Sequence, residues 1–580
     1  MKYNDYQSLN YLMPDTAWAW NMYGAGLENF GKEEQPELVN IPQPADDQLL
    51  VRIDSVGLCF SDLKLVKLGG SHPKLYNRDL ANQPTRLGHE VALTIIRVGR
   101  ALEGRYHVGQ RLAMQPDTYQ KGKSTAYGYT VPGGLIQYHL IGPEVLETDE
   151  GACLLPLEDN PISYGAASLL EPWGCVMASY TQRRRLWPLA GGVMWVIGSP
   201  GDKTAYQFTR GDLKPAVVVA TRAPEALLEM LRKSGARVEE RNHLSVDDYA
   251  ALSQEFTAGK GFDDIILLRP ASALQVETAA RLVARRGILN VIHDQPLDGK
   301  VAVDLGRLHY DYIAFVGNNT TDISRSYGEE RNRCELLPQG AALFVGAGGP
   351  MGQMHLQRAI ELPDGPRVLI ATEVNAERFK ALEQRFIPLA KKQNRELYLL
   401  NPSQSTESLA ALVARVSGGQ GVDDAVVCVP VTDLMTEAAA LMSPRGMLVL
   451  FAGVPNGTMA PVDFDGVYLA NTQFTGTSGL TLKDQRLVLE RARQGALSPE
   501  RSIAAIGGMF SARQGMQALA DGTYPGKIVI YPLLKDLPLL GLDELTEKLP
   551  AVAQHLGPDL TWTVAAEQAL YELYWNPQGS

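Results

Sequence analysis

The segment Ala341-Ala-Leu-Phe-Val-Gly-Ala-Gly-Gly-Pro-Met-Gly352 gives the clearest indication of the fold class. Its apolar half predicts a short buried strand, and the glycines after it predict a tight turn into a helix. The apolar run Arg367–Ala371 follows and predicts a second strand. Buried strands that alternate with helices predict a parallel sheet with right-handed crossovers, so the fold class is α/β, doubly wound.

The same order of segments occurs once before in the chain. Val193–Gly198 is an apolar run ending in glycine, followed by a stretch for which we expect a helix, then the strand Ala216–Ala220 and the amphipathic segment Glu225–Ser234. Later segments match at offsets of 159 or 160 residues: Gly261-Phe-Asp-Asp with Gly421-Val-Asp-Asp, Gly287-Ile-Leu with Gly446-Met-Leu, and Phe315-Val-Gly with Phe474-Thr-Gly. Such colinearity predicts two tandem copies of one domain.

The chain before the first copy has a different character. Short alternating runs such as Gln48–Val56 and Glu90–Val98, separated by Gly and Pro, predict a β-rich, partly closed barrel. After Gly479 we expect a helix, the strand Gly526–Tyr531 and a helical tail over Asp536–Trp575. The predicted domains are a catalytic domain of 1–187 and 480–580, a first copy of 188–335 and a second copy of 336–479.

Composition narrows the function classes. The 580 residues carry a net charge of −11, which argues against nucleic-acid or acidic-membrane partners. The one dense basic run, Arg183–Arg185, is expected to be a solvated helix end. Five scattered cysteines, no basic-then-apolar leader and no apolar run of about 18 residues predict a cytoplasmic protein without membrane segments.

Three short motifs in the first domain carry metal chemistry. They are Gly57-Leu-Cys59-Phe-Ser61-Asp62, Gly88-His89-Glu90 and Leu170-Glu171-Pro172. Cys59, His89 and a carboxylate from Glu90 or Glu171 make a ligand set that zinc accepts in catalytic sites. Asp62 is suited to orient the imidazole, and the Ser61 hydroxyl is suited to pass a proton between substrate and solvent.

These motifs resemble those of the medium-chain dehydrogenase/reductase superfamily, the zinc alcohol and sorbitol dehydrogenases, in the same order before a Rossmann domain. Val98-Gly99 followed by Gly109-Gln-Arg-Leu is similar to a turn of this superfamily. Gly104-Arg-Tyr with Gly109-Gln-Arg, Met114-Gln-Pro and Ala166-Ala-Ser-Leu-Leu-Glu-Pro172 are similar to its L-sorbose 1-phosphate reductase-like branch. The resemblance implies a GroES-like catalytic domain, with Cys59, His89 and Glu90 or Glu171 as metal ligands and Ser61 as proton relay. Residues 110–140 contain no cysteine, so one catalytic zinc and no structural zinc are expected.

The second copy holds the predicted dinucleotide site. The turn comprises Gly346, Gly348, Gly349, Pro350, Met351 and Gly352, one residue longer than the Rossmann Gly-x-Gly-x-x-Gly pattern. A turn of this kind lets the backbone approach a pyrophosphate at a helix N-terminus. Glu373 ends the second strand, where an acidic residue binds the ribose hydroxyls, so NAD(H) is preferred over NADP(H).

The first copy is open to two interpretations. Its turn, Gly198-Ser-Pro-Gly201-Asp202, places a carboxylate where a phosphate would sit, which favours a degenerate copy kept for packing or dimerisation. Alternatively, Arg222 binds the 2′-phosphate of NADP. The sequence leaves open which copy closes over the zinc.

The predicted activity is hydride transfer between NAD(H) and a secondary alcohol or ketone of a polyol, sugar or sugar phosphate. The rival hypotheses are a non-catalytic dinucleotide-binding or assembly protein and a zinc-free reductase of the same fold. The protein is expected to form a homo-oligomer, unless its two copies mimic a dimer within one chain.

Overall fold

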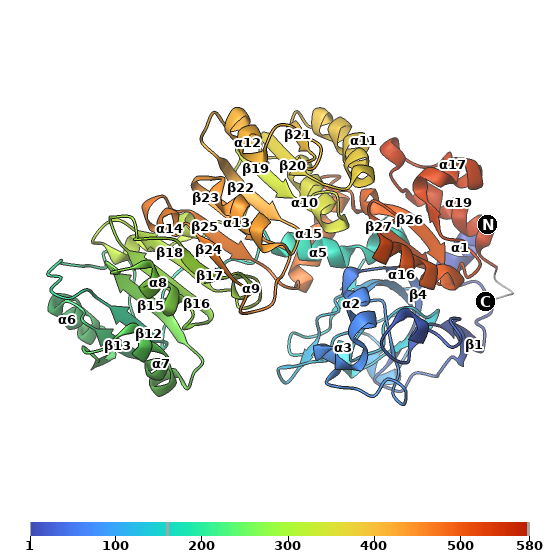
Figure 1. Ribbon diagram of the computed structural model, residues 1–580. Helices are drawn as coiled ribbons and strands as arrows, with labels where there is room; N and C mark the ends of the chain where they lie inside the picture. The colour runs from blue at the N-terminus through green and yellow to red at the C-terminus, as the bar shows by residue number, and fades with distance from the viewer. Residues whose placement is uncertain (1, 158–161, 577–580) are drawn as a thin grey trace. The chain divides into compact units, whose positions relative to one another are not determined.

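The computed structural model describes residues 2–157 and 162–576. They form two compact units (Figure 1): unit 1 comprises Met1–Ala178, Gly349–Met354 and Gly479–Ser580, and unit 2 comprises Ser179–Gly348 and His355–Ser478. The predicted domain limits at 187, 335 and 479 stay predictions. Within the described ranges, no helix has the length and apolar character that a membrane crossing requires.

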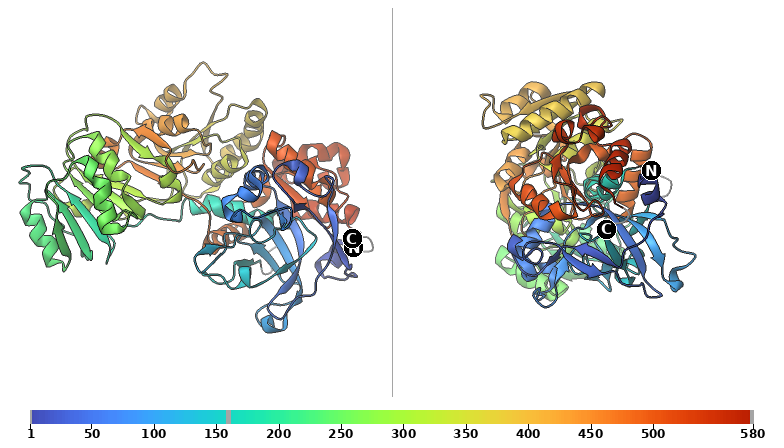
Figure 2. Two further views of the ribbon diagram at one scale, coloured as in Figure 1. Left: turned by 60° about the horizontal axis from the view of Figure 1, so that its bottom comes forward. Right: turned by 90° about the vertical axis from the view of Figure 1, so that its right-hand side faces the viewer.

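Unit 1 is built on an eight-stranded sheet with the strand order β11-β7-β6-β4-β27-β26-β28, in which β10 also pairs with β4. The strands are β4 (Leu49–Gly57), β6 (Glu90–Val98), β7 (Arg111–Met114), β10 (Tyr138–Ile141), β11 (Leu154–Pro156), β26 (Ile503–Gly508), β27 (Lys527–Tyr531) and β28 (Leu540–Gly541). Strand β4 is buried along its whole length. The C-terminal segment completes this sheet, because β27 pairs antiparallel with β4 through Val529 and Gly57 (Figure 2).

Three two-stranded ladders and ten α-helices complete the described part of unit 1. The ladders are β1–β3 (Thr16–Ala19, Glu37–Asn40), β2–β5 (Asn21–Met22, Thr85–Arg86) and β8–β9 (Tyr119–Gln120, Lys123–Ser124). The helices are α1 (Lys2–Gln7), α2 (Phe60–Leu68), α3 (Pro143–Leu146), α4 (Tyr164–Ser168), α5 (Leu170–Ala178), α15 (Leu482–Arg493), α16 (Ala512–Asp521), α17 (Leu545–Lys548), α18 (Pro550–Ala553) and α19 (Val564–Tyr574).

Unit 2 contains two six-stranded parallel sheets of the same topology. The first has the order β14-β13-β12-β15-β16-β18, with β12 (Val193–Ile197), β13 (Val217–Thr221), β14 (Arg237–Glu240), β15 (Phe262–Leu268), β16 (Val283–Ile292) and β18 (Ala314–Asn318). The second has the order β21-β20-β19-β22-β23-β25, with β19 (Ala341–Val345), β20 (Val368–Thr372), β21 (Glu396–Leu400), β22 (Val422–Val427), β23 (Met442–Leu450) and β25 (Gln473–Gly476). The predicted tandem of doubly wound sheets is confirmed.

Helices flank each sheet, and one further ladder joins the two copies. The helices are α6 (Glu225–Lys233), α7 (Tyr249–Thr257), α8 (Ala273–Ala280) and α9 (Leu305–Tyr310) in the first copy, and α10 (Pro350–Glu361), α11 (Ala376–Lys392), α12 (Leu409–Ser417), α13 (Thr432–Ala440) and α14 (Asp465–Leu469) in the second. Strand β17 (Val301–Asp304) pairs antiparallel with β24 (Met459–Val462).

An arginine fixes the entry of the chain into the first sheet. Arg185 donates from Nη1 to Asp264 Oδ2 (3.0 Å) and from Nη2 to the carbonyl of Asp263 (2.6 Å). The same Asp264 oxygen accepts from the backbone N–H of Leu189 (2.8 Å), and Asp263 Oδ2 accepts from that of Val193 (2.8 Å). The adjacent aspartates on β15 therefore hold the start of β12.

The second sheet repeats this network group by group. Arg333 donates to the Asp424 carboxylate and to the carbonyl of Asp423 (2.9 Å). Asp424 Oδ2 accepts from Leu337 N (2.7 Å), and Asp423 Oδ2 accepts from Ala341 N (2.9 Å). Because the same hydrogen bonds recur at equivalent positions, the duplication is visible in atomic contacts as well as in strand order.

The first copy departs from the prediction between its first two strands. Residues 198–216, for which a helix was expected, contain turns and bends but no helix. The corresponding segment of the second copy holds α10, which has 12 residues. The first copy therefore lacks the helix N-terminus that a pyrophosphate site requires.

The expectation of a solvated basic run at Arg183–Arg185 is wrong. Arg184 is only 6% exposed, and Arg185 is held by Asp264. The C-terminal tail was predicted helical, and it contains the short strand β28 in addition to α17, α18 and α19.

The repeated network gives a matched pair of stability predictions. We expect Asp264→Asn and Asp424→Asn each to lower the free energy of unfolding by about 3 kcal/mol, because each leaves a largely buried arginine without its charged partner. Urea unfolding followed by circular dichroism measures this. Glu225→Gln, in an exposed ion pair with Arg232, should leave the midpoint unchanged. Two aspartate variants as stable as the wild type would contradict the proposed role of the network.

Candidate functional site

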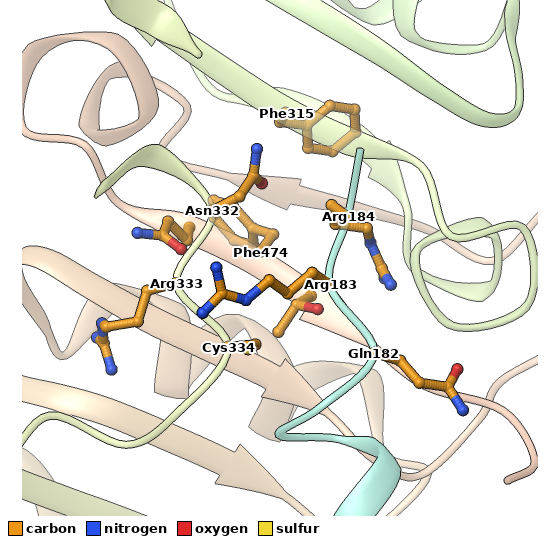
Figure 3. Close-up of a pocket in the computed structure, with 10 residues that line it drawn as sticks. Gln182, Arg183, Arg184, Phe315, Asn332, Arg333, Cys334 and Phe474 are labelled. Carbon is orange, nitrogen blue, oxygen red and sulfur yellow. The ribbon is translucent and has the colours of Figure 1, made fainter. Parts of the chain in front are cut away.

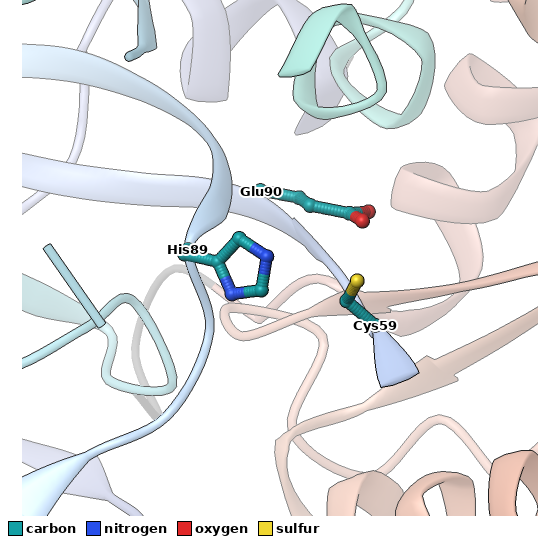
Figure 4. Close-up of side chains that lie close together, drawn as sticks. All are labelled: Cys59, His89 and Glu90. Atoms are coloured by element: carbon teal, nitrogen blue, oxygen red, sulfur yellow. The ribbon is translucent and has the colours of Figure 1, made fainter. Parts of the chain in front are cut away.

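Three of the predicted metal ligands lie together in unit 1. Cys59 Sγ, an imidazole nitrogen of His89 and a carboxylate oxygen of Glu90 all lie within 4.8 Å of one another (Figure 4). Cys59 immediately precedes α2, whereas His89 and Glu90 lie at the start of β6. His89 is 5% exposed and Glu90 is fully buried, whereas Cys59 is partly exposed, so the cluster is open to solvent on the side of the thiol.

Asp62 connects the segments that carry these ligands. Its Oδ2 accepts from the backbone N–H of Cys59 (3.0 Å), and its Oδ1 accepts from that of Gly88 (3.2 Å). Oδ1 also contacts His89 Nδ1 (3.2 Å), which leaves Nε2 as the nitrogen available to a metal. Burial by itself lowers the pKa of His89, but the nearby Asp62 carboxylate outweighs it and raises the pKa well above its ordinary value.

Lys527 is a site residue that the motifs did not identify. It starts β27, is buried, and its Nζ contacts Glu90 Oε1. Glu90 Oε2 is buried without a hydrogen-bond partner, and a Cβ on Gly57 would lie 2.1 Å from it. A glycine is therefore required opposite this carboxylate. Only the partly apolar strand Gly526–Tyr531 was visible in the sequence, and no local signal connected its lysine to residue 90.

Glu171, the alternative ligand, lies outside the three-residue cluster. It is buried on α5, where burial raises its pKa to about 7, the charges of Glu90 and Asp117 add to the shift, and His89 opposes it. Its Oε1 accepts a weak hydrogen bond from Cys175 Sγ (3.8 Å). The structure therefore brings Glu90, rather than Glu171, to Cys59 and His89.

Ser61 lies in the first turn of α2, two residues after Cys59. It is partly exposed, and its hydroxyl has no hydrogen-bond partner among the described residues. A hydroxyl in this position is available to a substrate and to solvent.

The donor set fits zinc. A thiolate, an imidazole and a carboxylate are ligands that zinc accepts, and three protein ligands leave a fourth position for water or substrate. The unpartnered Glu90 Oε2 and the aspartate behind His89 agree with such a site.

A second group of polar residues lies beside His89. Lys74 Nζ donates to Asp117 Oδ1 (2.9 Å) and lies 4.7 Å from the centre of the Tyr129 ring. The Tyr129 ring centre is 5.7 Å from that of His89. Because Asp117 lies just after β7 and Lys74 lies in a short 3-10 helix, Pro73–Leu75, neither residue stood out in the sequence.

Gly348 of the glycine-rich turn and Glu373 lie against each other in unit 2. Gly346 has a φ of 73°, which favours glycine, and a Cβ on Gly348 would lie 2.2 Å from Glu373 Oε2. Glu373 is 6% exposed and accepts from the backbone N–H of Asn375 (2.8 Å). Gly349 precedes α10, whose first residues are Pro350, Met351 and Gly352.

The corresponding turn of the first copy is closed by its own contacts. Asp202 accepts hydrogen bonds from Thr204 N (2.9 Å) and Tyr206 Oη (2.7 Å). A Cβ on Gly198 would lie 2.2 Å from the carbonyl oxygen of Arg222. The backbone at Arg222 therefore occupies the space next to this glycine. The Arg222 side chain donates to the carbonyl of Asn242 (3.2 Å).

Comparisons with known proteins agree with this organisation. Residues 45–146 match the family model of the alcohol dehydrogenase GroES-like domain. The chain is 30% identical over 315 residues to the uncharacterized protein YggP of Escherichia coli, covering 50% of this chain and 72% of that protein. It is 23% identical to L-sorbose 1-phosphate reductase of Klebsiella pneumoniae over 94% of this chain and 96% of the relative.

Among solved structures, 2R,3R-butanediol dehydrogenase of Bacillus subtilis has the same fold, with a TM-score of 0.50 at 15% identity, covering 89% of this chain and 99% of that one. The family match, the relatives and the α/β architecture confirm the resemblance that the motifs predicted. The chain belongs to the medium-chain dehydrogenase/reductase superfamily.

Proposed function

We propose that this protein is a zinc-dependent oxidoreductase that transfers hydride between NAD(H) and a secondary alcohol or ketone of a polyol, sugar or sugar phosphate. The observation that carries the proposal is the cluster of Cys59, His89 and Glu90 with Asp62 behind the imidazole. Packing alone does not require a thiol, an imidazole and two carboxylates in one buried place.

In this proposal Cys59, His89 and Glu90 hold one zinc, and Glu171 is the carboxylate that can replace Glu90. Bound zinc would act as a Lewis acid that lowers the pKa of a coordinated alcohol. Asp62 keeps His89 in the tautomer that presents Nε2. Lys527 holds one oxygen of Glu90 and leaves the other free. The Ser61 hydroxyl carries the substrate proton toward solvent.

The second copy is the proposed nucleotide domain. It has the glycine-rich turn followed by α10, whereas the first copy has no helix there. The segment Gly349–Met354 belongs to unit 1, where Gln353 donates to the carbonyl of Pro525 (3.0 Å), two residues before Lys527. Glu373 favours NAD(H), because its carboxylate repels a 2′-phosphate.

The substrate class rests on the relatives and on one wall of the site. One relative is named L-sorbose 1-phosphate reductase and another mannitol-1-phosphate 5-dehydrogenase. The Lys74–Asp117 pair beside His89 combines a donor and an acceptor, and Tyr129 offers a ring face. Such a set suits a chain of hydroxyl groups.

Two alternative functions differ from this proposal in the zinc content that they predict. A non-catalytic dinucleotide-binding or assembly protein, and a zinc-free reductase of this fold, would each contain no zinc. An NADP site in the first copy would depend on Arg222.

Metal analysis of the purified protein tests the centre directly. We expect about one zinc per chain, and loss of that zinc in Cys59→Ser and His89→Ala, because three ligands are needed to hold a catalytic zinc. Cys153→Ala, which removes a buried thiol from another part of unit 1, should keep the metal. A wild-type protein purified without zinc, and unable to take it up, would refute the proposed centre.

Titration of NADH into the nucleotide variants assigns the cofactor site. Glu373→Ala should weaken NADH binding about tenfold to a hundredfold, the effect expected for losing charge-assisted hydrogen bonds to the ribose. Arg222→Ala is the matched variant in the first copy and should bind NADH like the wild type. The reverse pattern would place the nucleotide in the first copy.

Kinetics test the substrate wall. Lys74→Met should raise KM for the substrate about tenfold or more while zinc content stays constant, because a charged hydrogen bond to a substrate oxygen is lost. Lys67→Met changes an exposed lysine of α2 and serves as the control. An unchanged KM in Lys74→Met would exclude this residue from substrate recognition.

A further inference from the structure

The proposed function gives the first copy of unit 2 no role. No helix follows its turn, and the backbone of Arg222 occupies the space beside Gly198 that a nucleotide would need. Yet its hydrophobic core is well formed and continues into that of the second copy, with Val303, Phe315, Phe464 and Val467 in one cluster. Phe315 and Phe464 meet at 5.2 Å between ring centres. The first copy is therefore built to pack against the second.

We define the seam as the elements through which the two copies meet: β17, β18 and α9 of the first, and β24, β25 and α14 of the second. Strands β17 and β24 pair antiparallel from Val301–Val462 to Asp304–Met459. Helix α14 packs on β18, α9 packs on β25, and the edge strands β18 and β25 lie next to each other. Figure 1 shows these elements gathered between the two sheets.

The contacts across the seam are reciprocal. Gly317 and Gly476 are 159 residues apart in the chain, and so are His309 and Tyr468. A Cβ on Gly317 would lie 2.6 Å from Tyr468 Cβ, and a Cβ on Gly476 would lie 3.0 Å from His309 Cα. Each copy thus presents a glycine to the same helix position of the other.

Hydrogen bonds also cross the seam in both directions, although their acceptors are not equivalent positions. His309 Nδ1 of the first copy donates to the carbonyl of Leu450 in the second (3.0 Å). Tyr468 Oη of the second copy donates to the carbonyl of Gln295 in the first (2.8 Å). When residue i of one body contacts residue j of the other, and j contacts i in return, the interface is isologous, which is the property of a twofold dimer.

A buried arginine fastens the end of the seam. Arg184 Nη2 donates to the carbonyl of Leu308 in the first copy and to that of Gly476 in the second, both at 2.7 Å. Burial lowers the pKa of Arg184 to about 10, so it stays charged at neutral pH. Nearby, Phe315 and Phe474, which match each other in the two copies, line a small pocket (Figure 3).

We propose that the first copy is a permanent partner subunit carried within the chain. The seam has the reciprocal contacts of a symmetric dimer whose two halves have been joined, and the first copy covers the edge strand β25 of the second sheet. The protein is therefore a monomer in which the second copy already has its partner. This inference depends on the seam alone and not on zinc, nucleotide or substrate.

Sedimentation equilibrium of the full chain over a wide concentration range tests the proposal. We expect the mass of a single chain throughout, because the edge available for pairing is already covered. A dimer that persists on dilution would overturn it, whether the chains exchange their first copies or associate through another face.

Seam variants provide a second measurement. Gly317→Val and Gly476→Val should each lower the Tm by about 5 °C, and by similar amounts, since each added side chain meets the neighbouring strand of its own copy and the helix of the other copy at equivalent positions. Gly299→Val has open space around it and should keep the wild-type Tm. The milder Gly317→Ala and Gly476→Ala serve if the valine variants do not fold. If the Gly317 and Gly476 variants both kept the wild-type Tm, the seam would not be a packed interface that stabilises the protein.

Discussion

The carboxylate of Asp62 holds together the two chain segments on which the candidate centre depends. It accepts hydrogen bonds from the backbone of Cys59 and Gly88 and contacts the ring of His89, so one side chain sets the distance between thiol and imidazole. A buried carboxylate is costly unless it is paired and hydrogen-bonded, and here all its partners come from the ligand-bearing segments. Helix α2, strand β6 and the core of unit 1 position that single group, which is why the motif spacing was informative.

Much of this arrangement could be predicted because it is local. Cys59, Ser61 and Asp62 share the start of one helix, and the parallel sheets follow from apolar runs that recur at constant offsets. What could not be predicted depends on distant partners. Lys527 reaches Glu90 across 437 residues, and no pattern near either residue indicates the pair. Arg184 was expected in solvent because nothing in its own neighbourhood reveals the carbonyl groups that surround it.

The duplicated domain shows what is retained and what changes when a copy loses one task. The Arg–Asp network at the sheet entry is identical in kind in both copies, because each sheet needs its first strand held. The glycine-rich turn is different: in the first copy coil replaces the helix, and Asp202 turns inward to its own neighbours. The helix expected at residues 198–216 of the first copy is absent, whereas the second copy keeps α10 after its turn. The hydrogen-bond network that holds the first strand is thus present in both copies, whereas the turn and helix N-terminus that suit an anion are present only in the second.

The pairing of β27 with β4 has a consequence for how the protein is made. The strand that carries Lys527 leaves the ribosome only after both six-stranded sheets have been synthesised. Until then, the edge of β4 at Val56–Gly57 lacks the strand with which it pairs. Contacts between such distant segments form slowly, because a long loop must close first, and an uncovered strand edge is prone to wrong pairing. The intervening sheets shorten that loop once they fold, since compact bodies bring their ends closer than an unfolded chain does. A strand that is synthesised late thus completes a sheet whose first strands are made early.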